Sequence, residues 1–191
     1  MTACASPVDL PPTTSTAAGR FAVTSAVSEA FFNANADRIA HACGAMAECF
    51  LAGGRMFVCG DGAQRSDVAH VVVEFVHPVV VGKRALPTMP LPAIANGDAA
   101  RAIGTLCRNS DILMLVCAEA VDESARDIVR IAQQHGLLTI VLQGSGAATS
   151  GDHVFVVPSR DPCIVQETHE ILYHVLWELV HVFFEHRAVS A

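Results

Sequence analysis

The longest regular pattern of apolar and polar positions lies near the N-terminus and is helical. Between about Phe21 and Ala52, Ala, Ile, Met and Phe recur at spacings of three and four residues, as on the buried face of a helix. The polar stretch from Asn33 to Asp37 predicts an interruption that would divide this segment into two helices. Gly53 and Gly54 follow it, and glycine is typical of a helix C-terminus. The pattern predicts that N-terminal helices form part of one layer of the fold.

Beyond Gly54, short apolar runs alternate with segments of helical period. Four of these runs predict buried strands: RMFVCG, DILMLVCA, LLTIVLQG and HVFVVP. The Pro-punctuated segment ALPTMPLPA predicts an edge strand, because proline has no backbone N–H to donate to a neighbouring strand. The intervening segments predict helices over 66–76, 97–110, 122–136 and 163–187.

Candidate caps and stops support these helices. Ser66 or Asp67 is expected to cap the first of them, and Asp122 or Ser124 the third, which Gly136 ends. Strands that alternate with helices favour a parallel sheet covered on both faces. We therefore expect an α/β three-layer sandwich in a single domain over residues 21–191, with a long C-terminal helix. Residues 1–20, rich in Ser, Thr, Ala and Pro, are expected to form a disordered or loosely attached tail.

The composition of the chain limits the kinds of molecule that the protein is expected to bind. The chain has 191 residues, of which 52% are hydrophobic and 16% charged, so little polar surface is left to cover a monomer and a homo-oligomer is expected. The net charge of −7 and the absence of a basic run argue against a nucleic-acid surface. No run reaches the roughly 18 apolar residues of a membrane-spanning helix. Seven scattered cysteines without a CxxC pair suit a reducing compartment, so we expect a cytoplasmic protein.

Two helical segments carry the candidate chemistry. His70 and Glu74 lie four residues apart, so one helix face presents both, and Gln166, Glu170 and His174 follow at successive four-residue steps on the last helix. His, Glu and Gln can supply nitrogen and oxygen ligands to a zinc ion, and the same His and Glu can instead transfer protons. A Glu and His pair on a helix is more often only a solvated face. Here, however, Glu74 lies within the apolar run VVVEFV, which favours a functional site.

The order of these pieces resembles the SIS (sugar isomerase) domain. The stretches GGRMFVCGDGAQRSDVAHVVVEF and VQETHEILYHVLWELV carry the resemblance, with DILMLV, ESARDIVRIAQQHGLLTIVLQG and HVFVVPS between them. The nearest resemblance is to phosphoheptose isomerases and to their non-catalytic cousins in bacterial replication initiation.

The resemblance implies a flavodoxin-like parallel sheet and a homotetramer with active sites between subunits. It also implies one zinc or other divalent metal per site at His70, Glu74, Gln166 and His174. Glu74 and His174 would be the catalytic base and acid of an aldose–ketose isomerisation through an enediol, with a sugar phosphate such as sedoheptulose 7-phosphate as substrate. The other histidines of the last helix, His169, His181 and His186, are expected at the surface or at an interface.

The expected phosphate-binding loops depart from the family pattern. Members of the family hold the phosphate with a Ser/Thr-rich loop such as STSGNS, whereas the corresponding stretch here is CAEAVD at 117–122, without a hydroxyl and with two carboxylates. The first glycine loop, at 60–64, has also gained an acid. The candidate substrate-binding residues at these two loops are Gly60, Asp61, Gly62, Gln64, Glu119 and Asp122.

Three functional hypotheses remain open at this point. The first is a phosphoheptose isomerase-like enzyme. The second is a non-catalytic oligomeric SIS protein that serves as an accessory factor to a protein partner and that retains a metal. The third is a divergent enzyme whose ligand is neutral or cationic, which the acidic loop would suit.

Overall fold

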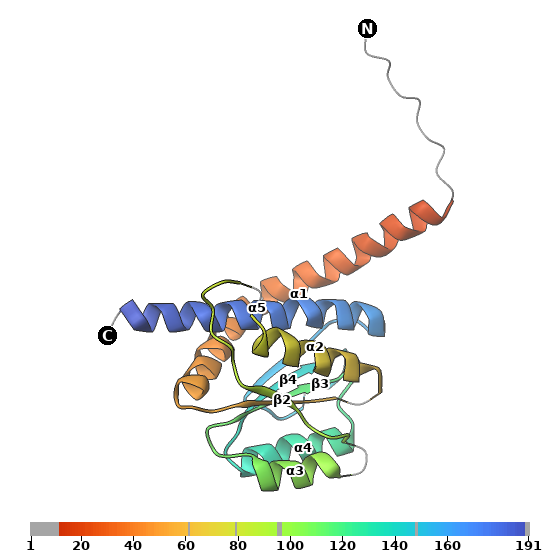
Figure 1. The fold of residues 1–191 in the computed structure, drawn as a ribbon. Helices are drawn as coiled ribbons and strands as arrows, with labels where there is room; N and C mark the ends of the chain where they lie inside the picture. The colour runs from red at the N-terminus through yellow and green to blue at the C-terminus, as the bar shows by residue number, and fades with distance from the viewer. Residues whose placement is uncertain (1–11, 61, 79, 95–96, 148, 190–191) are drawn as a thin grey trace.

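The computed structural model describes residues 12–60, 62–78, 80–94, 97–147 and 149–189 (Figure 1). Its elements follow one another along the chain in the order α1 (Pro12–Leu51), β1 (Met56–Cys59), the 3-10 turn η1 (Gly62–Gln64), α2 (Arg65–Val76), β2 (Thr88–Pro90), α3 (Asp98–Leu106), β3 (Ile112–Val116), α4 (Glu123–Gln134), β4 (Leu138–Gln143), β5 (His153–Val156) and α5 (Pro162–Val189). No helix in this part of the chain is long and apolar enough to cross a membrane.

The strands form one parallel sheet in the order β2-β1-β3-β4-β5. Met56 of β1 pairs with Ile112 of β3, and Ile112 pairs with Leu138 of β4. The proline-containing strand β2 lies at one edge, where a missing backbone donor costs least. The predicted α/β class, the parallel sheet and the order of strands and helices along the chain are confirmed.

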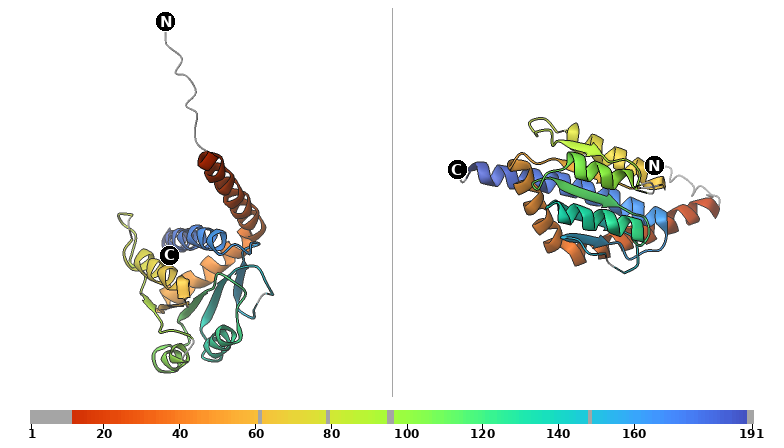
Figure 2. Two further views of the ribbon diagram at one scale, coloured as in Figure 1. Left: turned by 90° about the vertical axis from the view of Figure 1, so that its right-hand side faces the viewer. Right: turned by 90° about the horizontal axis from the view of Figure 1, so that it is seen from below.

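Two helical layers cover the sheet, as Figures 1 and 2 show. Helices α1, α2 and α5 lie on one face, and α3 and α4 lie on the other. Successive residues of a strand point to opposite faces, so Ile112 and Met114 of β3 pack in the core under the three-helix layer and Leu113 and Leu115 in the core under the other. All five residues of β3 are buried, as expected of a central strand covered on both sides.

Helix α1 is continuous, and the predicted interruption at Asn33–Asp37 is wrong. Asn35 is buried, and its side-chain amide donates a hydrogen bond to the carbonyl oxygen of Phe31 at 2.8 Å. Arg38 donates to the Asn35 side chain at 2.9 Å, so the polar stretch is satisfied within the helix.

The same helix also begins earlier than predicted. Residues 12–20, expected in the tail, are helical, and the first turns of α1 extend past the rest of the domain (Figure 1). Arg20 joins this part to the start of α5 through an ion pair with Asp161 at 2.5 Å. Residues 1–11, the rest of the expected tail, lie outside the described residues.

The topology creates a crevice at the carboxyl ends of β1 and β3. These strands are neighbours, but the chain leaves β1 into α2 on one face of the sheet and leaves β3 toward α4 on the other. Ligands of open α/β sheets bind at such a switch point, so we expect a ligand site near the N-terminal parts of α2, α4 and α5.

Candidate active site

Helices α2 and α5 are joined by a buried polar contact near their N-terminal ends. The amide nitrogen of Gln166 donates to Asp67 Oδ1 at 3.0 Å, and Asp67 is only 2% exposed. Burial raises the pKa of Asp67, and the hydrogen bond from Gln166 opposes part of that rise. The predicted N-cap, Ser66 or Asp67, is wrong: the N-cap residue is Gln64 without a side-chain cap, because Asp67 turns inward to Gln166 and Ser66 bonds to Ala63.

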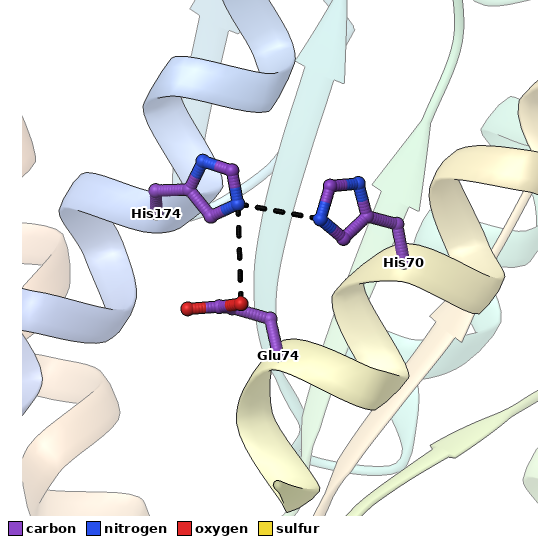
Figure 3. A group of neighbouring side chains, drawn as sticks. All are labelled: His70, Glu74 and His174. Atoms are coloured by element: carbon purple, nitrogen blue, oxygen red, sulfur yellow. Dashed lines mark hydrogen bonds and ion pairs between the residues drawn. The ribbon is translucent and has the colours of Figure 1, made fainter. Parts of the chain in front are cut away.

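One and two turns further along α2, His70 and Glu74 meet His174 of α5 (Figure 3). The Nε2 atoms of His70 and His174 are 3.3 Å apart, and Glu74 Oε2 lies 4.0 Å from His174 Nε2. The Glu74 side chain is 16% exposed, whereas that of His174 is 43% exposed. Ring and carboxylate thus face one another across the two helices, with His174 the most open to solvent. We call these three residues the His–Glu cluster.

Tyr173 contacts the cluster through His70, and it was not among the residues predicted from the sequence. Its hydroxyl lies 2.8 Å from His70 Nδ1, and the residue is fully buried. Burial, reinforced by nearby carboxylates, raises the pKa of Tyr173, so the phenol stays protonated. The sequence carried no signal for this role beyond the position of Tyr173 directly before His174.

The separation of the two histidines fits a tetrahedral metal, whereas Glu74 Oε2, at 4.0 Å from His174 Nε2, would have to move closer. Zn–N bonds of about 2.0–2.1 Å in tetrahedral geometry hold ligand atoms roughly 3.3 Å apart, which is the separation of the two Nε2 atoms. His70 would coordinate through Nε2 while Nδ1 bonds to Tyr173, the arrangement usual for metal-bound histidines. Gln166, predicted as a fourth ligand, has its amide nitrogen on Asp67, one turn away from the cluster.

The same contact can serve a proton instead of a metal. A hydrogen bond between the Nε2 atoms of His70 and His174 requires that one carry a hydrogen and the other a lone pair. A metal ion requires a lone pair on both. The cluster can therefore bind either a shared proton or a cation, and protonation would compete with metal binding.

A pocket of about 380 Å³ lies at the carboxyl end of β3, before the start of α2, and none of the three cluster residues lines it. The described residues that line it come from η1, the segment after β2, the end of β3 and the loop after it, and the first turns of α4 and α5: Ala63, Gln64, Ile94, Val116, Cys117, Ala118, Glu119, Ala120, Asp122, Ala125 and Pro162. We call it the switch-point pocket. Of the predicted substrate-binding residues, Gln64, Glu119 and Asp122 line it.

The other predicted substrate-binding positions lie elsewhere. Gly60 packs against β3, where a Cβ would lie 2.8 Å from the carbonyl oxygen of Val116, and it lines a separate groove together with Arg65. Gly62 adopts a φ of 58° in η1 and does not line the switch-point pocket. Asp61 lies outside the described residues. Gly60 and Gly62 therefore shape the turn between β1 and α2.

Asp122 caps the helix that borders the pocket. Its Oδ1 accepts a hydrogen bond from the backbone N–H of Ala125 at 2.8 Å, which confirms the predicted cap of α4. A helix N-terminus is a favourable position for an anion because its N–H groups are unpaired. Here a carboxylate of the protein already occupies it.

Two further histidines of α5 differ from expectation. His169 and His181 were expected at the surface or at an interface, but they are 1% and 2% exposed. His169 bonds to the backbone of Gln143 while its Nε2 has no partner, and burial lowers the pKa of His169 to about 4. His181 lies 3.0 Å from the carbonyl oxygen of Arg84 and fixes the loop after α2. Both lie on the buried side of the helix, which its strongly apolar sequence did not distinguish from the exposed side.

Comparison with known proteins places these features in a family. The phosphoheptose isomerase of Thermodesulfovibrio yellowstonii is 29% identical over 175 residues, covering 83% of this chain and 87% of that protein. The phosphoheptose isomerase of a Roseiflexus species is 30% identical over 148 residues, covering 70% of this chain and 75% of that protein. The chain belongs to the phosphoheptose isomerase family.

Solved structures agree with this family fold. A phosphoheptose isomerase from Francisella tularensis matches with a TM-score of 0.77 at 21% identity, covering 90% of this chain and 99% of that one. That of Neisseria gonorrhoeae matches with a TM-score of 0.75 at 20% identity, covering 87% and 97%. No protein-family model matches the chain. The chain is thus an SIS protein of phosphoheptose isomerase type whose switch-point pocket lacks the hydroxyl loop that the family resemblance predicts.

Proposed function

We propose that this protein catalyses aldose–ketose isomerisation at the His–Glu cluster. The observation that carries the proposal is the convergence of His70, Glu74 and His174 from two helices, in a fold that also has a pocket at the switch point of the sheet. The curated relatives are named phosphoheptose isomerases, so a ketoheptose and its 7-phosphate are the substrates to test.

Glu74 and His174 suit the two proton transfers of the reaction. A base must remove a proton from the carbon next to the carbonyl group, and an acid must return a proton to the neighbouring carbon after an enediol forms. We assign the base to Glu74, a carboxylate within an apolar helix face, and the acid to His174, which is open to solvent. Glu74 Oε2 and His174 Nε2 are 4.0 Å apart, so a protonated imidazole of His174 would stabilise the negative charge of the Glu74 carboxylate.

A divalent metal, with zinc the first candidate, would be held by His70, by His174 through Nε2 and by one oxygen of Glu74, which would leave the second Glu74 oxygen and the His174 Nδ1–H for the proton transfers. When bound, such an ion would polarise the oxygen atoms of the substrate as a Lewis acid. Tyr173 would accept the Nδ1 hydrogen of His70 and so keep the Nε2 lone pair directed into the cluster. Gln166 is assigned to positioning, since it ties Asp67 on α2 to α5 one turn before His70.

We further propose a cytoplasmic homotetramer. Several large apolar side chains are exposed on the single chain, among them Phe21 at 74% and Val73 at 56%, and an assembly would cover them. Val73 lies directly before Glu74, so a neighbouring subunit bound there would approach the cluster.

A non-catalytic accessory role is the second candidate function. The observation that favours it is the switch-point pocket, whose described lining has neither a hydroxyl nor a cation to hold a phosphate. In that case the cluster would retain a metal without turnover, and the protein would act through a protein partner.

Solvent exchange separates the two candidates. Enzyme supplied with zinc is incubated in D₂O with sedoheptulose and, separately, with its 7-phosphate, and deuterium at the carbon next to the carbonyl is followed by NMR. We expect incorporation with at least one of them, reduced about 100-fold or more in Glu74→Gln, since a general base contributes 10²–10⁴-fold. Glu178→Gln, an exposed carboxylate one turn beyond His174, is the matched control and should retain full activity. No exchange with either sugar at high enzyme concentration would reject the isomerase.

A further inference from the structure

The switch-point pocket differs in charge from a phosphate site. Its described lining contains two carboxylates, Glu119 and Asp122, and no Lys, Arg, Ser or Thr. A phosphate dianion is ordinarily held by cations, hydroxyls and backbone N–H groups. The described lining has neither a cationic side chain nor a hydroxyl.

One of the backbone donors at the start of α4 is also engaged. Asp122 Oδ1 accepts the N–H of Ala125, so the helix terminus that would attract an anion carries a negative side chain instead. Two negative charges at about 4–6 Å from a phosphate would each weaken its binding by roughly ten-fold in a partly screened site.

The basic residues near this part of the sequence have other positions. Arg65 lines the groove on the other side of Gly60, Lys83 forms an ion pair with Glu185, and Arg84 stacks over Phe184 with its guanidinium carbon 4.9 Å from the ring centre. None of the three lines the switch-point pocket, so none offsets its carboxylates.

The pocket is instead equipped to accept hydrogen bonds. Glu119 is exposed at its rim, Asp122 keeps one carboxylate oxygen beyond the capping bond, and Gln64 adds a side-chain amide. Around these groups the lining is apolar, with Ile94 and Val116 among its members. A volume of about 380 Å³ is in the range of small-molecule pockets.

We propose that the switch-point pocket binds a hydrogen-bond-donating, non-anionic end of a sugar, a hydroxyl or an ammonium group, in place of a phosphate. This inference rests on the proposed function, because it names the substrate class of the same site. Gln64 lies six residues before His70 on the same helical path, about 9 Å along the axis. The pocket would therefore receive the end of the sugar distant from the reacting carbons at the His–Glu cluster.

Three sugars that differ only at the far end test this proposal: sedoheptulose, its 7-amino-7-deoxy analogue and its 7-phosphate. Affinities for the zinc-loaded protein are measured by calorimetry at constant ionic strength. We expect the 7-phosphate to bind at least about 10-fold more weakly than the tighter of the other two. Tightest binding of the amine would identify ammonium as the preferred group, and equal or tighter binding of sedoheptulose would identify hydroxyl.

The double variant Glu119→Gln/Asp122→Asn removes both charges but keeps the cap, since Asn is as good an N-cap as Asp. Its affinity for the 7-phosphate should rise about 10-fold or more, whereas its affinity for sedoheptulose should not rise, because amides replace the carboxylate acceptors. The proposal is overturned if the wild-type protein binds the 7-phosphate most tightly, if the double variant leaves the preference unchanged, or if none of the three sugars binds.

The isomerase proposal is judged separately. Deuterium incorporation into the 7-phosphate at high efficiency would support the isomerase and reject the non-anionic pocket. Discrimination against the phosphate without any incorporation would support the pocket and reject the isomerase.

Discussion

The His–Glu cluster and the switch-point pocket are close along the chain, since Gln64 of the pocket comes six residues before His70 of the cluster, but they are built from different kinds of structure. The cluster consists of side chains within α2 and α5, both fixed against the sheet by the large core that contains Phe75, Tyr173 and Trp177. The pocket is formed mostly by the turn before α2 and by the loop after β3. The cluster brings together three side chains that can bind a metal or transfer a proton, whereas the described lining of the pocket lacks the usual means to hold a phosphate.

This difference follows from how each part is held. Residues four apart on a helix keep their mutual geometry as long as the helix packs, so His70 and Glu74 depend on α2 as a whole. The loop at 117–122 contributes a few exposed side chains, which can change in charge with little effect on the core. The chemistry of the cluster and the specificity of the pocket can therefore vary independently.

The largest expected effect concerns the cluster itself. His174→Ala should lower zinc affinity by roughly 1,000-fold, because a binding free energy of about 10–16 kcal/mol is shared among three or four ligands. Competition with a chelator of known affinity measures it. His135→Ala, an exposed histidine at the end of α4, is the control. Equal zinc affinity in wild type and His174→Ala would remove His174 from the site and with it the contrast between cluster and pocket.

A second experiment tests whether His169, on the buried side of the helix that carries His174, is uncharged in the folded protein. Burial holds the pKa of His169 at about 4, below its ordinary value of 6.5. Below about pH 6.5 the unfolded chain binds a proton that the folded chain does not, so the free energy of unfolding should fall by up to about 3 kcal/mol as pH drops toward 4.

In His169→Gln this part of the pH dependence should disappear, as measured by urea denaturation at several pH values. Exposed His135→Gln provides the comparison. If His169→Gln kept the same slope between pH 6.5 and 4 as the wild type, His169 would not be the buried neutral group described above.

The third prediction disturbs the pocket and leaves the cluster intact. A Cβ on Gly144 would lie 2.1 Å from the carbonyl oxygen of Ala118, so Gly144→Ala must displace the loop that lines the pocket. We expect a loss of about 1–3 kcal/mol in unfolding free energy, the usual cost of overpacking, together with weaker sugar binding and unchanged zinc affinity. Gly19→Ala, where a Cβ meets nothing within 4 Å, should not destabilise the protein. Parallel losses of sugar and zinc binding in Gly144→Ala would mean that the two parts are coupled.

The smallest expected effect concerns Tyr173, the buried side chain that contacts His70 of the cluster. Tyr173→Phe preserves the buried ring but removes the hydroxyl that contacts His70 Nδ1. Zinc affinity should fall by roughly 10-fold, the lower end of what the partner of a metal-bound histidine contributes. Chelator competition again gives the value, and an unchanged affinity would show that His70 is oriented by packing alone.

Much of the fold could be predicted because its signals are local. The apolar runs of β3 and β4 and the capped, strongly periodic α4 need no tertiary information, and each is present in the structure. Helix α1 was expected to break at Asn33–Asp37 because polarity alone suggests a loop. The bonds of Asn35 to Phe31 and from Arg38 form within the helix, but the burial of Asn35 and the position of Arg38 over Phe155 depend on packing against the sheet and could not be read from the sequence.

The candidate site also combines features that are local in the sequence with features that depend on packing between distant segments. The four-residue spacing of His70 and Glu74 is local, and the family resemblance added His174, which the structure brings to them. Tyr173 and the bond between Gln166 and Asp67 join residues about 100 positions apart, so only the packing of α2 on α5 reveals them. The buried positions of His169 and His181 were missed for the same reason, because α5 is apolar around much of its circumference.

The contrast between cluster and pocket can be tested most directly by one crystallographic measurement. Crystals grown with zinc and soaked in tungstate, a heavy analogue of phosphate, would be recorded at the absorption edges of both metals. We predict an anomalous peak for zinc among His70, Glu74 and His174 and none for tungsten beside residues 117–122. A tungsten peak at that loop, or no zinc among the three side chains, would contradict the account.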